Sequence, residues 1–382
     1  MNLLTYKLTC YYHMKRCIEG SHAVAQAVGQ CRPDVVAAYP ITPQTHIVED
    51  LGAMAANGQA DFEFVRADSE FAAASIVLGA SAAGGRTYTA TSAQGLLYMT
   101  EVIYTIAGMR LPVVMTVANR AISAPINIWN DQQDSMTVRD SGWIMLYAAD
   151  NQAAVDLHYI AFKIAEQVKI PVMVNMDGFV LTHTVEPVDI PDEKLVRSYL
   201  PDYIPTEGEY LDVKNPITLG SFVPPSDYQE IRLELHGDLL NVVALLKKEF
   251  KTFKKTFGRS YELVDYYGDK DAGTVMVTLG SVAGTIKDAV DQLNKEKNKV
   301  GLLTVNCFRP FPDDEIIKSL AKAKKIIVLE KDISLGSAGA LELEIKRALY
   351  GYSKANIIGI VTGLGGRDIT MEDIKKYFKK NK

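Results

Sequence analysis

The sequence predicts an α/β protein with two units, each built on a mostly parallel β-sheet. Apolar runs of strand length alternate with segments of helical spacing from residue 18 to residue 176, and again from residue 274 onward. The apolar runs are continuous rather than alternating, which is typical of parallel strands buried on both faces. A proline-rich stretch interrupts the periodicity between the two blocks. We therefore expect a doubly wound sheet, an irregular connector and a second α/β unit.

The first block is expected to alternate strands and helices along the chain. The expected strands are 35–39, 62–66, 86–91, 112–119, 143–148 and 171–176. The expected helices are 18–30, 44–57, 70–84, 96–108 and 153–167. This order is that of a parallel sheet covered by helices on both faces.

The rest of the chain divides into a connector and the second block. Prolines recur from residue 187 to residue 225, and a long amphipathic helix is expected over 228–256. The second block has expected strands at 274–278, 300–305, 325–329 and 357–361, and expected helices at 283–295, 313–322 and 337–349. We accordingly predict an N-terminal extension (1–13), a first domain (14–185), a linker of arm and helix (186–260) and a second domain (261–382).

Composition and charge limit the function classes. A chain of 382 residues with 48% hydrophobic and 23% charged residues is typical of an ordinary globular protein of two domains. The net charge of −5 provides no basic field for nucleic acid. No segment is apolar enough to cross a bilayer, and the first residues make a poor signal peptide, so a cytoplasmic location is expected. The cleaner start at Met14 suggests that residues 1–13 are an upstream extension.

The cysteines do not form a metal or cluster motif. Cys10, Cys17, Cys31 and Cys307 include no CxxC pair, and so reduced thiols are expected. We therefore predict no metal on this chain and expect any metal redox centre on another chain.

The segment Tyr39-Pro40-Ile41-Thr42-Pro43 follows an apolar strand. Each proline fixes its own φ and restricts the residue before it, which holds Thr42 with little backbone freedom. The carboxyl end of a strand is where α/β sheets bind ligands. An ordinary proline-punctuated strand end is an equally good interpretation of this segment alone.

Three further turns carry polar side chains. Glu70 follows Asp68-Ser69 at the start of a small-residue helix, where it either complements the helix dipole or points into a cleft. The turn 91–96 presents Ser92, Gln94 and Gly95 with backbone N–H groups.

Arg120 ends an apolar strand, and a buried arginine requires a partner. A structural salt bridge is the ordinary interpretation, and a bidentate grip on a substrate carboxylate is the functional one.

These turns are expected to converge on one crevice, because all follow parallel strands. A fixed hydroxyl and an arginine together suit a small carboxylate ligand. The sequence has no GxSxG elbow, Walker lysine loop, Rossmann GxGxxG or HExxH motif.

The chain resembles the α subunit of the pyruvate:ferredoxin oxidoreductases, which are thiamine-diphosphate-dependent 2-oxoacid:ferredoxin oxidoreductases. The resemblance is carried by YPITP, SEFAAASIVLGASAAGGRT, TSAQGLLYMTEVIYTIAGMRLPVVMTVANR and DQQDSM, and by MDGFVLTHTVEPV, RPFP and GLGGRDIT. These segments occur in order over nearly everything after Met14. Their combination is far more specific than any one of them.

The resemblance implies a fold and a set of cofactors and partners. It implies a pyrimidine-type thiamine-diphosphate-binding domain followed by a transketolase C-terminal-like domain. Thiamine diphosphate is shared with a β subunit, while Mg²⁺ and [4Fe-4S] clusters belong to partner subunits. The implied partners are β, γ and δ subunits, ferredoxin, coenzyme A and pyruvate, and the implied reaction is reversible conversion of pyruvate to acetyl-CoA and CO2.

The resemblance also implies residue roles. Glu70 matches the glutamate that bonds N1′ of the aminopyrimidine, and Thr42 and Arg120 match residues that hold the substrate carboxylate. Ser92, Gln94 and Gly95 are expected at the cofactor.

Several alternatives stay open at this stage. The substrate is pyruvate or another 2-oxoacid such as 2-oxoglutarate, a branched-chain acid or an aryl pyruvate. A non-catalytic assembly subunit and a stand-alone transketolase-like enzyme are the competing function classes.

Some polar residues elsewhere have weaker predicted roles. Asp131 and Asp134 lie near the site in sequence, but capping or surface roles are equally good. An ordinary strand-to-helix turn is favoured over an anion site at Gly280-Ser281, a tight interface turn is expected at 365–368, and a structural hydrogen bond is expected for His183.

Overall fold

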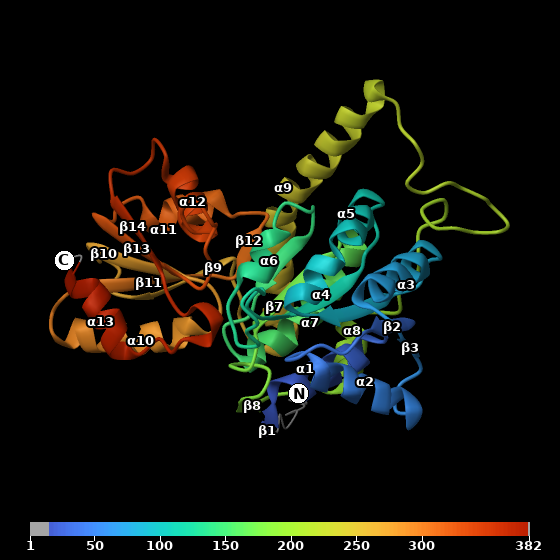
Figure 1. The fold of residues 1–382 in the computed structure, drawn as a ribbon, viewed down its shortest axis with the longest axis horizontal. Coiled ribbons are helices and arrows are strands. Elements are labelled where there is room, and N and C mark those ends of the chain that lie inside the picture. Colours follow the sequence, from blue (N-terminus) through green and yellow to red (C-terminus); the bar gives the residue numbers. More distant parts are fainter. Residues whose placement is uncertain (1–14, 381–382) are drawn as a thin grey trace, which may run out of the picture.

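The computed structural model describes residues 15–380, and the predicted extension 1–13, with Cys10, lies outside them. Two α/β units lie side by side, joined by the long helix α9 (Pro225–Phe257) (Figure 1). Of the remaining cysteines, Cys31 and Cys307 are buried, Cys17 is exposed, and all three are free thiols.

The first unit contains a seven-stranded sheet with the order β12-β6-β7-β5-β4-β2-β3. Its strands are β2 (Val35–Ala38), β3 (Glu63–Arg66), β4 (Thr87–Thr91), β5 (Val114–Asn119), β6 (Ile144–Tyr147), β7 (Val172–Asp177) and β12 (Cys307–Arg309). All pairs are parallel except that of β12 with β6. Every residue of β4, β5 and β7 is buried, as the continuous apolar runs predicted.

Helices cover both faces of this sheet. They are α1 (Gly20–Cys31), α2 (Thr45–Ala56), α3 (Glu70–Ala82), α4 (Ala93–Tyr98), α5 (Thr100–Gly108), α6 (Gln133–Thr137) and α7 (Asn151–Val168). Alternate residues of β2 enter different cores: Val36 and Ala38 pack in the core with α1, α7 and α9, and Ala37 packs in the core with α3 and α5. This alternation is the signature of a strand buried on two sides.

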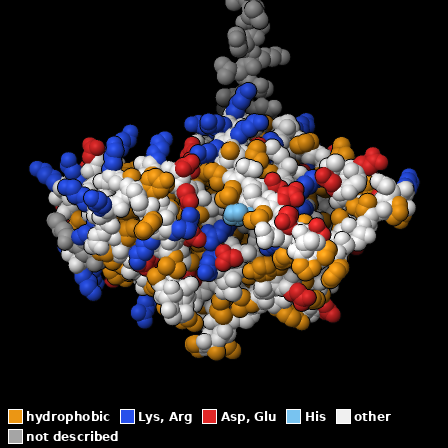
Figure 2. All heavy atoms as spheres, turned by 90° about the horizontal axis from the view of Figure 1, so that it is seen from above, with side chains coloured by type: hydrophobic (Ala, Val, Ile, Leu, Met, Phe, Trp, Pro, Cys, Tyr) orange, Lys and Arg blue, Asp and Glu red, His pale blue; other side chains and the backbone are white. Residues whose placement is uncertain are grey.

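The second unit contains a five-stranded sheet with the order β14-β13-β10-β11-β9. Its elements are β9 (Val264–Gly268), β10 (Thr274–Thr278), α10 (Val282–Lys295), β11 (Val300–Val305), α11 (Asp313–Leu320), β13 (Lys325–Glu330), α12 (Ala340–Leu349), β14 (Asn356–Val361), the 3-10 turn η1 (Leu364–Gly366) and α13 (Met371–Lys380). Lysine and arginine side chains are frequent over this unit in Figure 2. The predicted α/β class, with a mostly parallel sheet in each of two units, is confirmed. A third, two-stranded sheet pairs β1 (Arg16–Glu19) with β8 (Val185–Val188).

Some elements differ from the sequence expectations. The single helix expected at 96–108 is wrong: the structure has two helices, which meet at Met99. Strand β12 lies in the sequence of the second block but pairs with β6 of the first sheet. Short elements without a long periodic pattern were also missed, among them β1 (Arg16–Glu19), β8 (Val185–Val188) and α8 (Glu193–Tyr199).

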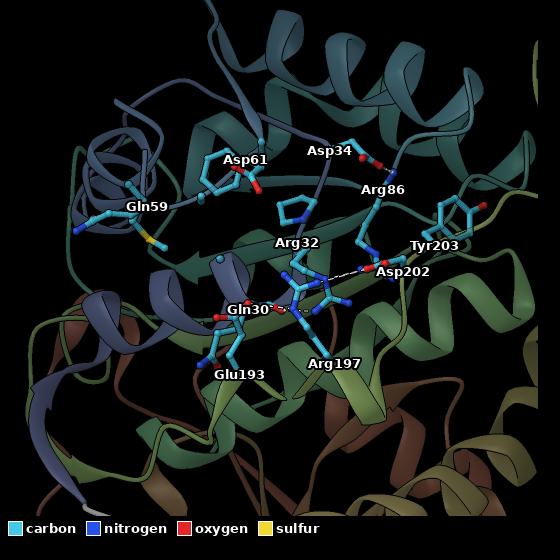
Figure 3. A pocket seen from close by; sticks show the side chains of 15 residues that line it. Gln30, Arg32, Asp34, Gln59, Asp61, Arg86, Glu193, Arg197, Asp202 and Tyr203 are labelled. Carbon is cyan, nitrogen blue, oxygen red and sulfur yellow. Dashed lines mark hydrogen bonds and ion pairs between the residues drawn. The ribbon is translucent and has the colours of Figure 1, made fainter. Parts of the chain in front are cut away.

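The proline-rich connector is attached to the amino-terminal edge of the first sheet. A hollow of about 390 Å³ lies at this edge, and arginine side chains beside it bind the connector (Figure 3). The buried Arg86 binds Glu166 at 2.5 Å and donates to the Pro201 carbonyl at 2.7 Å, and Arg32 donates to the Leu200 carbonyl at 2.6 Å. Both arginines are therefore bound to structural partners. The hollow lies at the opposite end of the strands from the predicted site.

Beyond this attachment the connector extends away from the body of the protein toward α9 (Figure 1). The connector has solvent-exposed apolar side chains: Ile204 is 84% exposed, Val213 is 96% exposed and Phe222 is 93% exposed. None of the helices in the described part of the chain has the length and apolarity to span a membrane.

Candidate active site

The predicted site residues gather at the carboxyl ends of β2, β4 and β5, which are neighbours in the sheet, and at the start of α3. The segment after β2 turns sharply into α2, and the buried Gln44 fixes this turn. Its amide donates to the Ala90 carbonyl of β4 at 2.6 Å, and its backbone N–H donates to the Ile41 carbonyl at 2.9 Å. Thr42 lies at the exposed tip. Sequence reasoning missed Gln44, although a buried glutamine after YPITP is what such a turn requires.

Arg120 and Thr42 are brought together. The Arg120 guanidinium donates from Nη1 to the Thr42 carbonyl at 2.8 Å and from Nε to the Asn127 carbonyl at 3.1 Å. Partial burial lowers the pKa of Arg120, against the opposing charge of Asp134. No carboxylate within residues 15–380 forms a salt bridge with this guanidinium, so the structural salt bridge weighed from the sequence is not seen there. The two carbonyl groups therefore orient the guanidinium of Arg120 but do not neutralise its positive charge.

Glu70 is the first residue of α3, and the preceding Ser69 caps the helix by accepting a hydrogen bond from the Ala72 N–H at 3.1 Å. The Glu70 side chain lies over Gly95 of the neighbouring turn. A Cβ placed on Gly95 would be 2.8 Å from Glu70 Cγ, 2.9 Å from its Oε1 and 2.5 Å from Thr91 Oγ1. Only glycine leaves room for the carboxylate here.

The turn between β4 and α4 holds the other predicted residues. Ser92 is buried and its Oγ donates to the Ala118 carbonyl at 2.7 Å, which ties this turn to β5. Gln94 donates weakly to the Ser123 carbonyl at 3.4 Å. Gln94 Oε1 and Thr91 Oγ1 are buried and have no hydrogen-bond partner among the residues that the structure describes. Two polar atoms thus remain unsatisfied beside Glu70 and Gly95.

Asp134 connects the two halves of the site. Its Oδ2 accepts from the Ala93 N–H at 3.0 Å and from the Arg120 N–H at 2.9 Å, and Oδ1 accepts from Asn119 Nδ2 at 2.9 Å. Burial raises the pKa of Asp134 to about 7, while these hydrogen bonds oppose the rise. The turn that lies against Glu70 and the strand end that carries Arg120 therefore share one buried carboxyl group. No local pattern in the sequence predicted that Asp134 would be buried.

A buried polar cluster joins the second unit to this region. Asp177 accepts from Lys331 Nζ at 2.5 Å, from the Ser281 N–H at 2.8 Å and from Gln132 Nε2 at 3.1 Å. Burial would raise the pKa of Asp177, but the Lys331 charge and the Ser281 hydrogen bonds outweigh it and lower the pKa. The Gly280-Ser281 turn thus does hold an anion at a helix start, namely an internal carboxylate.

The second unit also supports the loop that holds Arg120. The Gly365 N–H donates to Asp131 Oδ2 at 3.1 Å, and Asn127 Nδ2 donates to the Gly365 carbonyl at 3.0 Å. The glycine turn predicted for an interface is therefore found at the interface between the two units. His183 has the structural role expected of it, since its Nδ1 bonds Thr182 Oγ1 at 2.7 Å.

Comparison with solved structures shows the fold that this chain shares with known proteins. A 2-oxoglutarate:ferredoxin oxidoreductase from Magnetococcus marinus aligns with a TM-score of 0.73 and 20% identity, over 96% of this chain and 65% of that chain. A split-gene transketolase aligns with a TM-score of 0.56 and 12% identity, over 94% of this chain and 96% of that one. At these identities the likeness is one of fold alone.

Sequence comparison then gives the family. Residues 26–251 match the family described as pyruvate flavodoxin/ferredoxin oxidoreductase, thiamine diphosphate-binding, and residues 272–374 match pyruvate:ferredoxin oxidoreductase core domain II. The chain belongs to the pyruvate:ferredoxin oxidoreductase family.

Curated relatives align over nearly their whole length. Pyruvate synthase subunit PorA of Methanocaldococcus jannaschii is 48% identical over 94% of this chain and 93% of its own, and that of Pyrococcus abyssi is 45% identical over 94% and 92%. Ketoisovalerate oxidoreductase subunit VorA of Pyrococcus abyssi is 42% identical over 96% and 93%.

Proposed function

We propose that this chain is the α subunit of a multi-subunit pyruvate:ferredoxin oxidoreductase. The complex converts pyruvate and coenzyme A to acetyl-CoA and CO2, reversibly, and passes the electrons to ferredoxin. The observation that carries the proposal is the junction at Asp134, which sets the turn beneath Glu70 beside the Arg120–Thr42 pair at one edge of the sheet.

The residues around Gly95 suit the aminopyrimidine of thiamine diphosphate. Gly95 has no side chain, which leaves space beside Glu70. Thr91 Oγ1 and Gln94 Oε1 are buried and have no hydrogen-bond partner among residues 15–380, as is expected of polar atoms that bind a ligand. Thiamine diphosphate supplies the carbon chemistry when bound. Glu70 would hold the proton at the ring nitrogen, and Gln94 would orient the ring. Ser92 would position the turn rather than contact the cofactor, because its hydroxyl donates to the Ala118 carbonyl.

Arg120 and Thr42 are assigned to the substrate carboxylate. The guanidinium is oriented by two carbonyl groups, and its positive charge is not neutralised, because no carboxylate of the described residues forms a salt bridge with it. Its task is to orient the 2-oxoacid so that the bond to the carboxylate is held ready to break.

Partner chains complete the proposal. The diphosphate side of the cofactor, with Mg²⁺, is assigned to a β subunit. The [4Fe-4S] clusters are assigned to partner subunits of the same cytoplasmic complex, which also includes γ and δ subunits. The exposed apolar side chains of the connector, such as Val213 and Phe222, suit burial against these partners.

The test uses the reconstituted complex and pyruvate-dependent reduction of ferredoxin. Glu70→Ala is expected to leave assembly intact and to reduce turnover by at least about a hundredfold, as loss of a proton-transfer group does. Glu101→Ala is the matched control, because Glu101 is also in the first turn of a helix and is exposed. Normal turnover of the Glu70 variant would instead support a purely structural assembly subunit.

Arg120→Ala tests the carboxylate grip separately. It is expected to raise KM for pyruvate more than it weakens thiamine diphosphate binding, since it removes a contact to substrate alone. Equal losses in both would refute the assigned role.

A branched-chain 2-oxoacid is the second candidate substrate. The VorA relative is 42% identical to this chain, close to the identities of the PorA relatives. Comparison of kcat/KM for pyruvate and 2-oxoisovalerate in one complex decides between them.

A further inference from the structure

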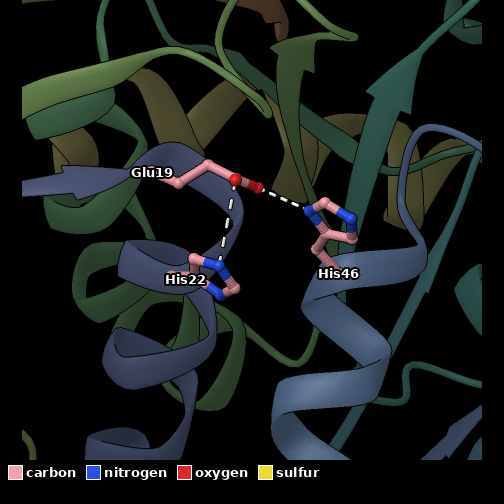
Figure 4. Close-up of side chains that lie close together, drawn as sticks. All are labelled: Glu19, His22 and His46. Atoms are coloured by element: carbon pink, nitrogen blue, oxygen red, sulfur yellow. Dashed lines mark hydrogen bonds and ion pairs between the residues drawn. The ribbon is translucent and has the colours of Figure 1, made fainter.

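A cluster of imidazole and carboxylate groups lies on the first unit, where β1 leads into α1 beside the start of α2 (Figure 4). Glu19 ends β1, His22 is in the first turn of α1, and His46 is in the first turn of α2. One ligand atom from each of these three residues lies within 4.8 Å of the others. We name Glu19, His22 and His46 the β1–α2 cluster.

The carboxylate of Glu19 lies between the two imidazoles. Its Oε1 is 2.6 Å from His46 Nδ1, and its Oε2 is 3.8 Å from His22 Nε2 (Figure 4). The two imidazole rings are parallel within 5°, with centroids 5.8 Å apart. Two imidazole nitrogens thus face one carboxylate from two different helices.

A second carboxylate orients the His22 ring. His22 Nδ1 is hydrogen-bonded to Asp50 Oδ2, and this contact leaves Nε2 as the nitrogen that faces Glu19. A histidine that ligates a metal usually gives its other ring nitrogen to a carboxylate in this way. Asp50 therefore lies where a carboxylate that orients a ligating histidine would lie, and Glu19 lies where a metal ligand would lie.

We propose that the β1–α2 cluster binds a divalent transition metal of the Zn²⁺ type through His22 Nε2, His46 Nδ1 and Glu19. Two imidazoles and one carboxylate are a ligand set that zinc uses, with bonds of about 2.0–2.2 Å, and water fills the remaining position. The three ligand atoms lie within 4.8 Å of one another, so an ion between them would require rotations of the side chains to reach these distances. The His22 and His46 side chains are 43% and 39% exposed, so an ion reaches them from solvent.

The ion would fasten α1 to α2 at the point where α2 begins. Thr42 lies three residues before the first residue of α2, so the site would stabilise the turn that presents Thr42. Sequence reasoning assigned no metal to this chain, because the cysteines form no metal-binding motif; His22 and His46 are far apart in sequence and were not considered. The competing explanation is that the cluster is held by hydrogen bonds and ion pairs alone.

The test is equilibrium dialysis of the metal-free full-length chain against Zn²⁺, followed by metal analysis. The wild type is expected to bind one equivalent more than the double variant His22→Ala/His46→Ala. Glu19→Gln keeps an oxygen that accepts a hydrogen bond but removes the charge, and is expected to weaken that equivalent at least about tenfold. Circular dichroism of each variant checks folding, and Zn²⁺ is expected to raise the Tm of the wild type but not that of His22→Ala/His46→Ala.

Matched controls address the other zinc-binding side chains. His236→Ala removes a histidine on α9, and Cys17→Ser removes the exposed thiol of β1. Cys10→Ser/His13→Ala removes donors outside the described residues. All three variants are expected to keep the full equivalent of Zn²⁺. The proposal is overturned if the wild type binds none, if the double variant binds as much, or if a control abolishes binding.

Discussion

Gly95→Ala is the sharpest test of how Glu70 is positioned. The added Cβ would meet Glu70 Cγ at 2.8 Å and Thr91 Oγ1 at 2.5 Å, whereas ordinary contacts between heavy atoms are about 3.5–4.0 Å. Glu70 must therefore retreat by about 0.7 Å, or the turn must move instead. Overpacking of this kind costs about 1–3 kcal/mol of stability. A misplacement of about 1 Å in a catalytic arrangement costs on the order of a hundredfold in rate.

Gly79→Ala is the matched control for this change. Gly79 is in the same helix as Glu70, and a Cβ there meets nothing within 4 Å. Alanine at that position is expected to stabilise the helix by up to about 1 kcal/mol and to leave activity unchanged.

The assay is turnover of the reconstituted complex with pyruvate, together with thiamine diphosphate affinity and gel filtration to verify assembly. We expect Gly95→Ala to lose about 10- to 100-fold in turnover while it still assembles. An assembled Gly95→Ala complex with turnover within about twofold of Gly79→Ala would refute the role of Glu70 at this turn.

Three further predictions concern the buried polar groups. Lys331→Met leaves the buried Asp177 carboxylate without its ammonium partner. Denaturant unfolding is expected to show a free energy of unfolding lower by about 3–5 kcal/mol. The double variant with Asp177→Asn should recover part of this loss. Asp134→Asn places an amide NH₂ group against N–H donors and should lower the free energy of unfolding by about 1–3 kcal/mol. The control Asp140→Asn, at an exposed carboxylate, should lower it by less than about 0.5 kcal/mol. Equal losses in the two variants would contradict the role of Asp134 in joining the two halves of the site. Burial lowers the pKa of His158 to about 4, so the unfolded chain takes up its proton first as pH falls below about 6.5. Between pH 7 and pH 4 the free energy of unfolding of the wild type should therefore fall by about 3 kcal/mol more than that of His158→Gln, and parallel curves would refute this.

The strand and helix order of this protein is determined locally. Continuous apolar runs such as β5 and β7 are buried throughout, and their periodicity alone predicted strands covered on both faces. The helix start at Glu70 was also predictable, because Ser69 is a good N-cap and its hydroxyl makes the capping bond.

Pairing across the chain was not predictable in the same way. Strand β12 is only three residues long, which is too short to show a periodic hydrophobic pattern. It forms because it pairs with the edge of β6. The break at Met99 likewise depends on how α4 and α5 pack, because helical spacing continues across it.

The sequence by itself determined that Thr42, Glu70 and Arg120 end strands or start helices, since the prolines, the cap and the apolar runs act on near neighbours. Only the tertiary structure decided that Asp134 is interior, that Gly95 makes room for Glu70, and that His22 and His46 share one carboxylate. The reason is physical: hydrogen bonds and close contacts between segments distant in sequence depend on sheet order and helix packing, which leave no local pattern along the chain.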